Sequence, residues 1–437
     1  MDHLLTARSQ MALTLGFHII FAVIGIGMPL LMIVAEALYI KTSNKIYLNL
    51  AKKWSMGVAI MFAVGAVSGT VLSFELGLLW PQFMEYAGPI IGMPFSLEGF
   101  AFFLEAIFLG IYLYGWNYVS KTVHLLAGFM VMLSGALSGI FVVCANAWMN
   151  TPTGFDMVNG MPTNIDPFKA MFNPSWFSQT FHMTIAAYVS VGFGVAGVHA
   201  FLLLKNGNRL FHKKAFLISF AIGAICTPLQ FFSGDLCAKN VAENQPAKFA
   251  AMEGHWDTEA YAPFNILGIP NEETEKTEYA IKIPYLLSFL TYGDISKEVT
   301  GLKSIKKDLR PPVAVVHFSF QLMLACGLIM FLAAIWALYL RLRKRDLTNN
   351  KPFLWLCVLC APLGFIAIEA GWVVTEVGRQ PFIITGYMLT KDAVTHVPNL
   401  GITFLLFMFI YLVLALAVIY LMKKQIFSSI GADNVDA

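Results

Sequence analysis

Residues 353–382 have the sequence FLWLCVLCAPLGFIAIEAGWVVTEVGRQPF, and this stretch decides the class of fold. Its apolar part, 353–376, is long enough to cross a bilayer as a helix. That helix would end at Glu376, three residues before Arg379. A carboxylate there is costly in hydrocarbon, so it usually faces a bundle interior, pairs with other polar groups and has a function. The stretch therefore predicts a membrane bundle that contains buried carboxylates.

The composition agrees with a membrane protein. Hydrophobic residues make up 58% of the 437 residues, charged residues make up 13%, and the mean hydropathy is +0.68. The formal net charge of +3 is too small to indicate nucleic-acid binding. The first apolar run lacks the cleavage pattern of a signal peptide, so it is predicted to be a retained span. Cys357 and Cys360 form a CxxC in the middle of a predicted helix, where packing is expected rather than metal binding.

Apolar runs of spanning length predict an all-α integral membrane protein with about nine transmembrane helices. These runs fall at roughly 11–40, 54–80, 96–117, 123–148, 178–204, 214–233, 313–340, 353–376 and 400–422. We therefore expect helices 1–6 within 1–233, a long polar loop at 234–312, and helices 7–9 with a tail within 313–437. No internal repeat is visible.

Lysine and arginine are distributed unequally between the two ends of the predicted spans. The segments after the first, third, fifth and seventh spans, with the C-terminal tail, hold 16 of them. The short segments on the other face hold only Arg8, Lys169, Arg379 and Lys391. Because basic residues accumulate in short cytoplasmic loops, the N-terminus and the loop at 234–312 are predicted to lie outside and the C-terminus in the cytoplasm.

Four residues in the outer half of the predicted bundle could ligate iron: His18, His182, Met323 and Glu376. Histidine and methionine side chains on facing helices commonly hold haem. The simpler interpretations are that a membrane histidine hydrogen-bonds a neighbouring helix and that Met323, one of 21 methionines, only packs. Three further histidines compete, so spacing alone does not select the ligands: His124, His199 and His317.

Several carboxylates interrupt the predicted spans. Glu98 and Glu105 are seven residues apart, so they share one helical face about 10 Å apart along the axis. Stacked carboxylates inside a membrane resemble a proton relay. Glu98 could instead cap a helix N-terminus, where the helix dipole favours an anion, but Glu105 lies too far in for that role. Glu75 and Glu369 are further buried candidates without an assignment.

The loop at 234–312 is the largest polar segment, and loops of this length are usually functional or disordered. Its run KFAAMEGHW, 248–256, predicts a short helix. Lys248 and Glu253 could hold and deprotonate a quinol beside apolar walls. The alternative, a surface helix with an exposed salt bridge, is the one that this run favours by itself.

Together these motifs resemble subunit I of the cytochrome bd-type quinol oxidases over essentially the whole chain. The matching stretches are ARSQMALTLGFH with His18, SLEGFAFFLE with Glu98 and Glu105, NAWMNTPTGF with Asn146 and Trp148, TFHMTIAAY with His182, QPAKFAAMEGHW with Lys248 and Glu253, and GWVVTEVGRQP with Glu376 and Arg379. Each stretch alone is unspecific, but the set is highly specific.

The resemblance implies roles for these residues. His182 and Met323 would be the axial ligands of a low-spin haem b. His18 and Glu376 would ligate two high-spin haems, one haem b and one haem d, unless a haem b replaces the haem d. Which of the two residues holds which haem stays open. The remaining roles would be proton conduction by Glu98 and Glu105, quinol binding by Lys248 and Glu253, and flanking of the haems by Arg379 and Trp372.

The resemblance also implies an electrogenic quinol:O2 oxidoreductase of a bacterial or archaeal plasma membrane. Quinol and O2 would be its substrates, and a second membrane subunit (subunit II) its partner, with small single-span subunits as an open possibility. Protons would come from the cytoplasm, so charge would be separated without a pump. The quinone type and the cyanide sensitivity stay open.

Two positions depart from the family's pattern. Phe382 stands where the family has tryptophan in GRQPW, and Gln321 stands where some members have arginine two residues before the methionine ligand. The loop is also of the family's short type. Neither position is a predicted iron ligand.

Two other classes of membrane protein would also contain buried carboxylates or histidines. An ion-coupled secondary transporter would use Glu98, Glu105, Glu376 and Arg379 as an ion site, but no inverted repeat and no matching pair of broken helices is visible. A haem-bearing membrane anchor without oxygen chemistry would have no use for Glu376.

Overall fold

The protein is described by a computed structural model covering residues 2–205 and 209–427, which is 77% helical. In this part of the chain nine helices are long and apolar enough to cross a membrane. They are α1 (His3–Thr42), α2 (Lys45–Leu79), α3 (Pro81–Tyr114), α4 (Lys121–Asn150), α6 (Trp176–Leu204), α7 (Arg209–Asn244), α10 (Val313–Leu342), α11 (Lys351–Val377) and α13 (Leu400–Phe427). The predicted fold class is confirmed. The part of the predicted tail at 428–437 lies outside the described residues.

Two helices extend well beyond the apolar runs that predicted them. α3 begins at Pro81 instead of near 96, and α7 continues to Asn244 instead of ending near 233. An apolar run in the sequence marks only the part of a helix that lies in hydrocarbon. The helix can extend beyond that run, because its backbone hydrogen bonds do not depend on apolar side chains. The polar end of α7 carries an ion pair of 2.6 Å between Lys239 and Asp235, one turn apart.

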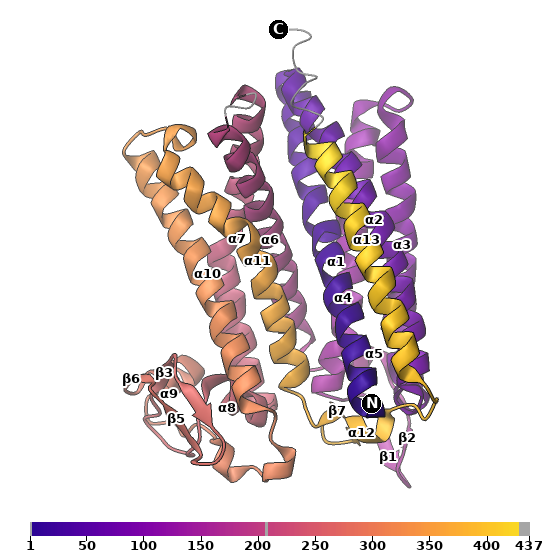
Figure 1. The fold of residues 1–437 in the computed structure, drawn as a ribbon, viewed down its shortest axis with the longest axis vertical. Coiled ribbons are helices and arrows are strands. Elements are labelled where there is room, and N and C mark those ends of the chain that lie inside the picture. The colour runs from indigo at the N-terminus through magenta and orange to yellow at the C-terminus, as the bar shows by residue number, and fades with distance from the viewer. Residues whose placement is uncertain (1, 206–208, 428–437) are drawn as a thin grey trace.

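The spans form two groups that lie side by side, as Figure 1 shows: α6, α7, α10 and α11 in one group, and α1 to α4 with α13 in the other. α1 joins the groups because it packs against α2, α4, α6, α11 and α13. The N-terminus of α1 lies at the same end as the segment between α7 and α10, and we call this end the loop end (Figure 1). α13 ends at the opposite end.

The segment between α7 and α10 folds into short elements at the loop end. They are α8 (Pro246–Glu253), β3 (Phe264–Ile266), β4 (Ile269–Asn271), β5 (Lys276–Glu278), β6 (Ile281–Ile283), α9 (Leu286–Tyr292), and the 3-10 turns η2 (Leu302–Ser304) and η3 (Lys307–Leu309). β3 pairs with β6 and β4 with β5, both antiparallel. The short helix predicted around Lys248 is confirmed as α8.

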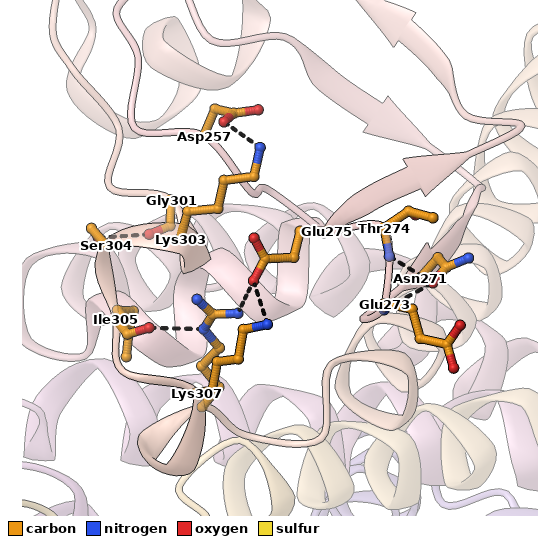
Figure 2. A network of polar contacts seen from close by, with 11 residues as sticks. Asp257, Asn271, Glu273, Thr274, Glu275, Gly301, Lys303, Ser304, Ile305 and Lys307 are labelled. Carbon is orange, nitrogen blue, oxygen red and sulfur yellow. Dashed lines mark hydrogen bonds and ion pairs between the residues drawn. The ribbon is translucent and has the colours of Figure 1, made fainter.

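Exposed ion pairs tie the outer parts of this segment together, as Figure 2 shows. Glu275 accepts a hydrogen bond of 2.8 Å from Arg310 and lies 3.5 Å from the ammonium of Lys307. Lys303 donates to Asp257 over 2.7 Å. Smaller elements connect the other spans: η1 (Gly115–Asn117), β1 (Asp156–Val158), β2 (Met161–Thr163), α5 (Pro167–Met171), η4 (Leu347–Asn349), β7 (Phe382–Ile384), β8 (Met388–Leu389) and α12 (Thr390–Ala393).

Glycines allow the helices of the group α6, α7, α10 and α11 to approach closely. A Cβ atom at Gly192 on α6 would lie 2.6 Å from the Cα atom of Gly223 on α7. At Gly197 it would lie 2.5 Å from the Cβ of Ala361 on α11. Membrane helices associate largely through such close packing of small residues. α6 is therefore held between α7 and α11 by backbone contact.

We predict that Gly192→Val lowers the melting temperature of the purified protein, because its side chain must push α7 away from α6. A loss of roughly 1–3 kcal/mol is expected for such overpacking. Gly327→Ala on α10 is the matched control, since nothing lies within 4 Å of a Cβ added there. Equal melting temperatures for the two variants would contradict the close α6–α7 contact.

Candidate functional site

His18 lies on α1 and faces α2. Its Nδ1 lies 2.9 Å from the hydroxyl of Ser68, which itself donates to the backbone carbonyls of Val64 and Gly65. A Cβ atom added at Gly69 would lie 3.0 Å from Cε1 of His18. The hydrogen bond at Nδ1 orients the ring, as the hydrogen bond to the second ring nitrogen does in histidines that bind a metal.

His182 and Met323 lie in the group formed by α6, α7, α10 and α11, and they face different neighbours. His182 on α6 points to α7, where Nδ1 lies 3.0 Å from the hydroxyl of Ser233 and the amide nitrogen of Gln230 lies 3.0 Å from Nε2. Met323 on α10 points to α11, and a Cβ atom added at Gly371 would lie 3.0 Å from its sulfur. Both residues are in one helix group, but the structure does not bring them into contact.

Glu376 ends α11 among polar side chains. It accepts hydrogen bonds from the amide of Asn146 on α4 and from Nη2 of Arg379. Arg379 is only 6% exposed, and its Nε and Nη1 have no hydrogen-bond partner among the described residues. Trp372, one turn before Glu376, lies beside Gly16 of α1. The structure thus brings Glu376 and Arg379 together at the end of α11, while Trp372 packs against α1.

The three competing histidines have protein partners. The ring nitrogens of His124 contact Glu36 at 2.8 Å and the carbonyl of Tyr112 at 2.9 Å. Nδ1 of His317 lies 2.8 Å from the carbonyl of Met252 and thereby joins α10 to α8. His199 shares a 3.0 Å contact with His212. These contacts account for the burial of all three without a metal.

Glu98 and Glu105 lie on the face of α3 that packs against α4. Ser138 donates to Glu98 over 3.3 Å, and a Cβ atom at Gly135, one turn earlier on α4, would lie 3.2 Å from the carboxyl of Glu105. Their shared face is confirmed. A helix-capping role for Glu98 is wrong, because α3 begins at Pro81 and Glu98 lies well inside it.

Further carboxylates contact α1, and their partners could not be predicted from the sequence. Glu75 on α2 is 1% exposed and accepts a hydrogen bond of 2.8 Å from Gln10 of α1. Glu369 on α11 reaches Gly16 of α1 and lines a largely apolar hollow of about 400 Å³ between α1, α10 and α11. Glu36, on α1 itself, makes the buried pair with His124 toward the end opposite the loop. A carboxylate inside an otherwise apolar run was the available signal for Glu36.

Lys248 and Glu253 are buried and do not pair with each other. Lys248 is 4% exposed and donates over 2.5 Å to the side-chain oxygen of Asn150, the last residue of α4. Burial, with the nearby charge of Arg379, lowers the pKa of Lys248 to about 7. Glu253 is 3% exposed, its Oε2 has no hydrogen-bond partner among the described residues, and burial raises its pKa to about 8. The alternative of a surface helix with an exposed salt bridge is therefore wrong.

The two departing positions have structural roles. Gln321 donates over 3.3 Å to the carbonyl of Asn265 and so ties α10 to β3. Phe382 begins β7, and its backbone N–H donates to the carbonyl of Arg379. Cys357 and Cys360 are fully buried in the packing between helices, as expected for filler residues.

The family model described as cytochrome bd terminal oxidase subunit I matches residues 6–429. The chain belongs to this family. The chain is 37% identical to a Bacillus subtilis protein named provisionally as a cytochrome bd menaquinol oxidase subunit I, over 97% of this chain and 96% of that one. It is 34% identical to a cytochrome bd ubiquinol oxidase subunit 1 of the same organism, over 99% and 96%. A chain of the bd oxidase from Geobacillus thermodenitrificans has the same fold, with a TM-score of 0.92, 39% identity, and coverage of 97% and 98%.

Family membership makes this chain a multi-pass membrane subunit of a respiratory cytochrome bd quinol oxidase, and it implies haem cofactors, a quinol substrate and partner subunits. The transporter and the membrane anchor are thereby set aside. The residues present fit haem. The unpartnered donors of Arg379 suit propionate carboxylates, and His18, His182 and Met323 each pack against a glycine of a neighbouring helix.

We predict that Met323→Leu abolishes the low-spin haem signal of the purified complex or converts it to high spin. Leucine has nearly the same volume but no sulfur, so the fold should lose less than about 1.5 kcal/mol. The measurements are the absorption spectrum and the haem content. Met330→Leu, at a buried position two turns further along α10, should leave the spectrum unchanged. A normal low-spin signal in Met323→Leu would show that another residue is the ligand.

Proposed function

We propose that this subunit oxidises quinol at the loop end and reduces O2 to water inside the membrane. The observation that carries the proposal is the buried Arg379 beside Glu376 at the end of α11, because its Nε and Nη1 have no hydrogen-bond partner among the described residues and suit the propionate carboxylates of a haem. Family membership supports the same reading.

The proposed cofactors are two haems b and one haem d, or a third haem b in its place. His182 and Met323 would be the axial ligands of the low-spin haem b, and His18 and Glu376 would each ligate a high-spin haem. Haem iron, when bound, supplies electron transfer and the reduction of O2. Ser68 and Ser233 would orient the two histidines through Nδ1. Arg379 would hold propionates through its free donors.

Quinol would bind near α8. Glu253 has a buried carboxyl oxygen without a partner among the described residues, and Phe249 on the same helix and Trp256 just after it pack in one hydrophobic cluster. Such a carboxyl can accept a proton from a quinol hydroxyl, while the aromatic side chains provide an apolar wall. Lys248 would contribute positive charge to the same region.

Protons for O2 reduction would enter from the end opposite the loop. Glu105 lies on the α1–α3–α4 interface, and the Glu36–His124 pair lies on α1 and α4 of the same interface. Gly25 on α1 and Gly135 on α4 both face the carboxyl of Glu105. Glu36 lies eleven residues from Gly25 along α1, and His124 lies eleven residues from Gly135 along α4. Both offsets place the Glu36–His124 pair about 16 Å from Glu105 along the helix axes. Glu105, with Glu98, would pass protons on to the oxygen site.

This arrangement would separate charge without a pump, because quinol releases its protons outside and O2 reduction takes protons from the cytoplasm. The excess of basic residues at the far ends of the spans supports an N-terminus and a loop segment outside and a C-terminus in the cytoplasm. The location would be a bacterial or archaeal plasma membrane, with subunit II as partner.

The test is the absorption spectrum and the extracted haems of the purified complex, with O2 consumption driven by ubiquinol or menaquinol. Low-spin haem b, a high-spin band and quinol-dependent O2 consumption are expected. A complex that contains haem but does not consume O2 with either quinol would refute the proposed activity.

We predict that Glu105→Gln reduces quinol-driven O2 consumption by roughly 100-fold or more, because glutamine keeps the size and polarity but cannot carry a proton. Glu105→Asp should retain part of the activity, since an acid remains on the same helical face. Glu85→Gln, at an exposed position of the same helix, is the control and should be neutral. Full turnover of Glu105→Gln with normal haem content would make Glu105 a structural residue.

We predict that quinol oxidation rises roughly fivefold between pH 7 and pH 8. With a pKa of about 8, the carboxyl of Glu253 is mostly protonated at pH 7, and the ionised form that accepts a proton grows as the pH rises through 8. Glu253→Gln should flatten this rise and slow turnover with quinol, but it should affect turnover with an artificial one-electron donor less. Glu243→Gln, exposed at the end of α7, should keep the wild-type profile. An unchanged pH profile in Glu253→Gln would exclude it as the base.

A further inference from the structure

An unbroken chain of side-chain hydrogen bonds joins α8 to the end of α11. Lys248 donates to Oδ1 of Asn150 over 2.5 Å, and Nδ2 of Asn150 donates to Oδ1 of Asn146 over 3.2 Å. Asn146 donates to Oε1 of Glu376, and Arg379 donates to the other oxygen of the same carboxylate. The chain crosses three elements, α8, α4 and α11. Lys248 is thus linked to the carboxylate of Glu376 by hydrogen bonds through the two asparagines.

Packing fixes Lys248 in this position. A Cβ atom added at Gly378, just after α11, would lie 2.7 Å from Cγ and 3.1 Å from Cδ of Lys248. The aliphatic part of the lysine therefore lies directly against the backbone that follows Glu376. With 4% exposure and a hydrogen-bonded ammonium, the side chain has a defined place at the junction of α8 and α11.

The charges at this junction are unequal when Lys248 is protonated. At pH values below its pKa of about 7, Lys248 and Arg379 supply two cations, and Glu376 supplies one carboxylate. Lys248 lies at the C-terminal end of α4, where the helix dipole favours a cation. A buried cation close to an iron site favours the reduced state of the iron, because reduction lowers the positive charge of the metal.

We propose that Lys248 is a positioning residue for Glu376. Through Asn150 and Asn146 it orients the carboxylate, and its charge raises the reduction potential of the haem that Glu376 ligates. The segment that covers the quinol is thereby coupled to the high-spin site. This inference rests on the proposed function, specifically on Glu376 as an iron ligand.

The experiment uses the whole purified complex with Lys248→Met, Lys248→Arg and Asn150→Leu. The readouts are haem content, the high-spin absorption band and the midpoint potential of the high-spin haems from a redox titration. Lys248→Met and Asn150→Leu should both shift the band at normal low-spin haem content. Lys248→Met should also lower the high-spin midpoint potential. Lys248→Arg should restore most of that potential, because it retains the charge.

Glu253→Gln is the comparison on the same helix. It should impair turnover with quinol and leave the high-spin band and midpoint potential at their wild-type values. If Lys248→Met alters only the quinol KM and leaves band and potential unchanged, the proposal is wrong. If Lys248→Met does not assemble, Asn150→Leu decides the question, since it breaks the chain and keeps the lysine.

Glu376→Ala separates this inference from the proposed function. Loss of one high-spin haem in Glu376→Ala would support Glu376 as the ligand. In that case, unshifted spectra of Lys248→Met and Asn150→Leu would overturn only the positioning role of Lys248. Full high-spin haem content in Glu376→Ala would overturn the ligand assignment and the positioning role with it.

Discussion

The structure depends on placing carboxylates inside an apolar bundle, where each unpaired charge is costly. Four of them are gathered along α1. From the loop end onward, Gln10 bonds Glu75, Gly16 faces Glu369, Gly25 faces Glu105, and Glu36 pairs with His124. Gln10 and Glu36 are 26 residues apart, which is about 39 Å of helix and more than the hydrocarbon thickness. The positions of α2, α3, α4 and α11 around α1 follow from these contacts and from the glycines that permit them.

The partners of the carboxylates change with depth. At the loop end Glu376 has a buried arginine, and a chain of three hydrogen bonds joins this carboxylate to Lys248. Glu98 and Glu105, deeper in α3, meet only a serine hydroxyl and glycine. A carboxylate bonded to an arginine and an amide has a fixed orientation, as a ligand requires. A carboxylate beside a hydroxyl and glycine has no described cation that holds it in place, so it suits proton transfer better. The two kinds of carboxylate therefore suit different tasks in one enzyme.

The sequence could predict the class of fold and the residue types of the site, but not the connections between them. Apolar runs located the spans, yet the first half of α3 was missed because its prolines and glycines interrupt the run at 81–95. The seven-residue spacing of Glu98 and Glu105 placed them on one face, because a helix fixes that relation locally. Lys248 and Glu253, five residues apart on α8, looked like a pair. In the structure they do not pair, because Lys248 bonds instead to Asn150 at the end of α4. No local sequence pattern predicts that α4 ends beside Lys248. Asn146 and Asn150 were visible at one-turn spacing, but their partners on α8 and α11 were not.

The loop segment is attached to the bundle more firmly at its inner side than at its outer side. The pairs of Asp257 with Lys303 and of Glu275 with Arg310 are partly exposed, and such pairs contribute about 0–1 kcal/mol each. α8, in contrast, buries nearly all of its side chains, and His317 holds the carbonyl of Met252 from α10. The hairpins at 264–283 are joined to the end of α8, because Asn265 donates to the carbonyl of Glu253 and Thr277 donates to the carbonyl of Gly254. A displacement of α8 must also move Lys248 against Gly378 and Asn150. A short loop is sufficient for this purpose, because the part of it that meets the end of α11 is a buried helix and not an exposed connection.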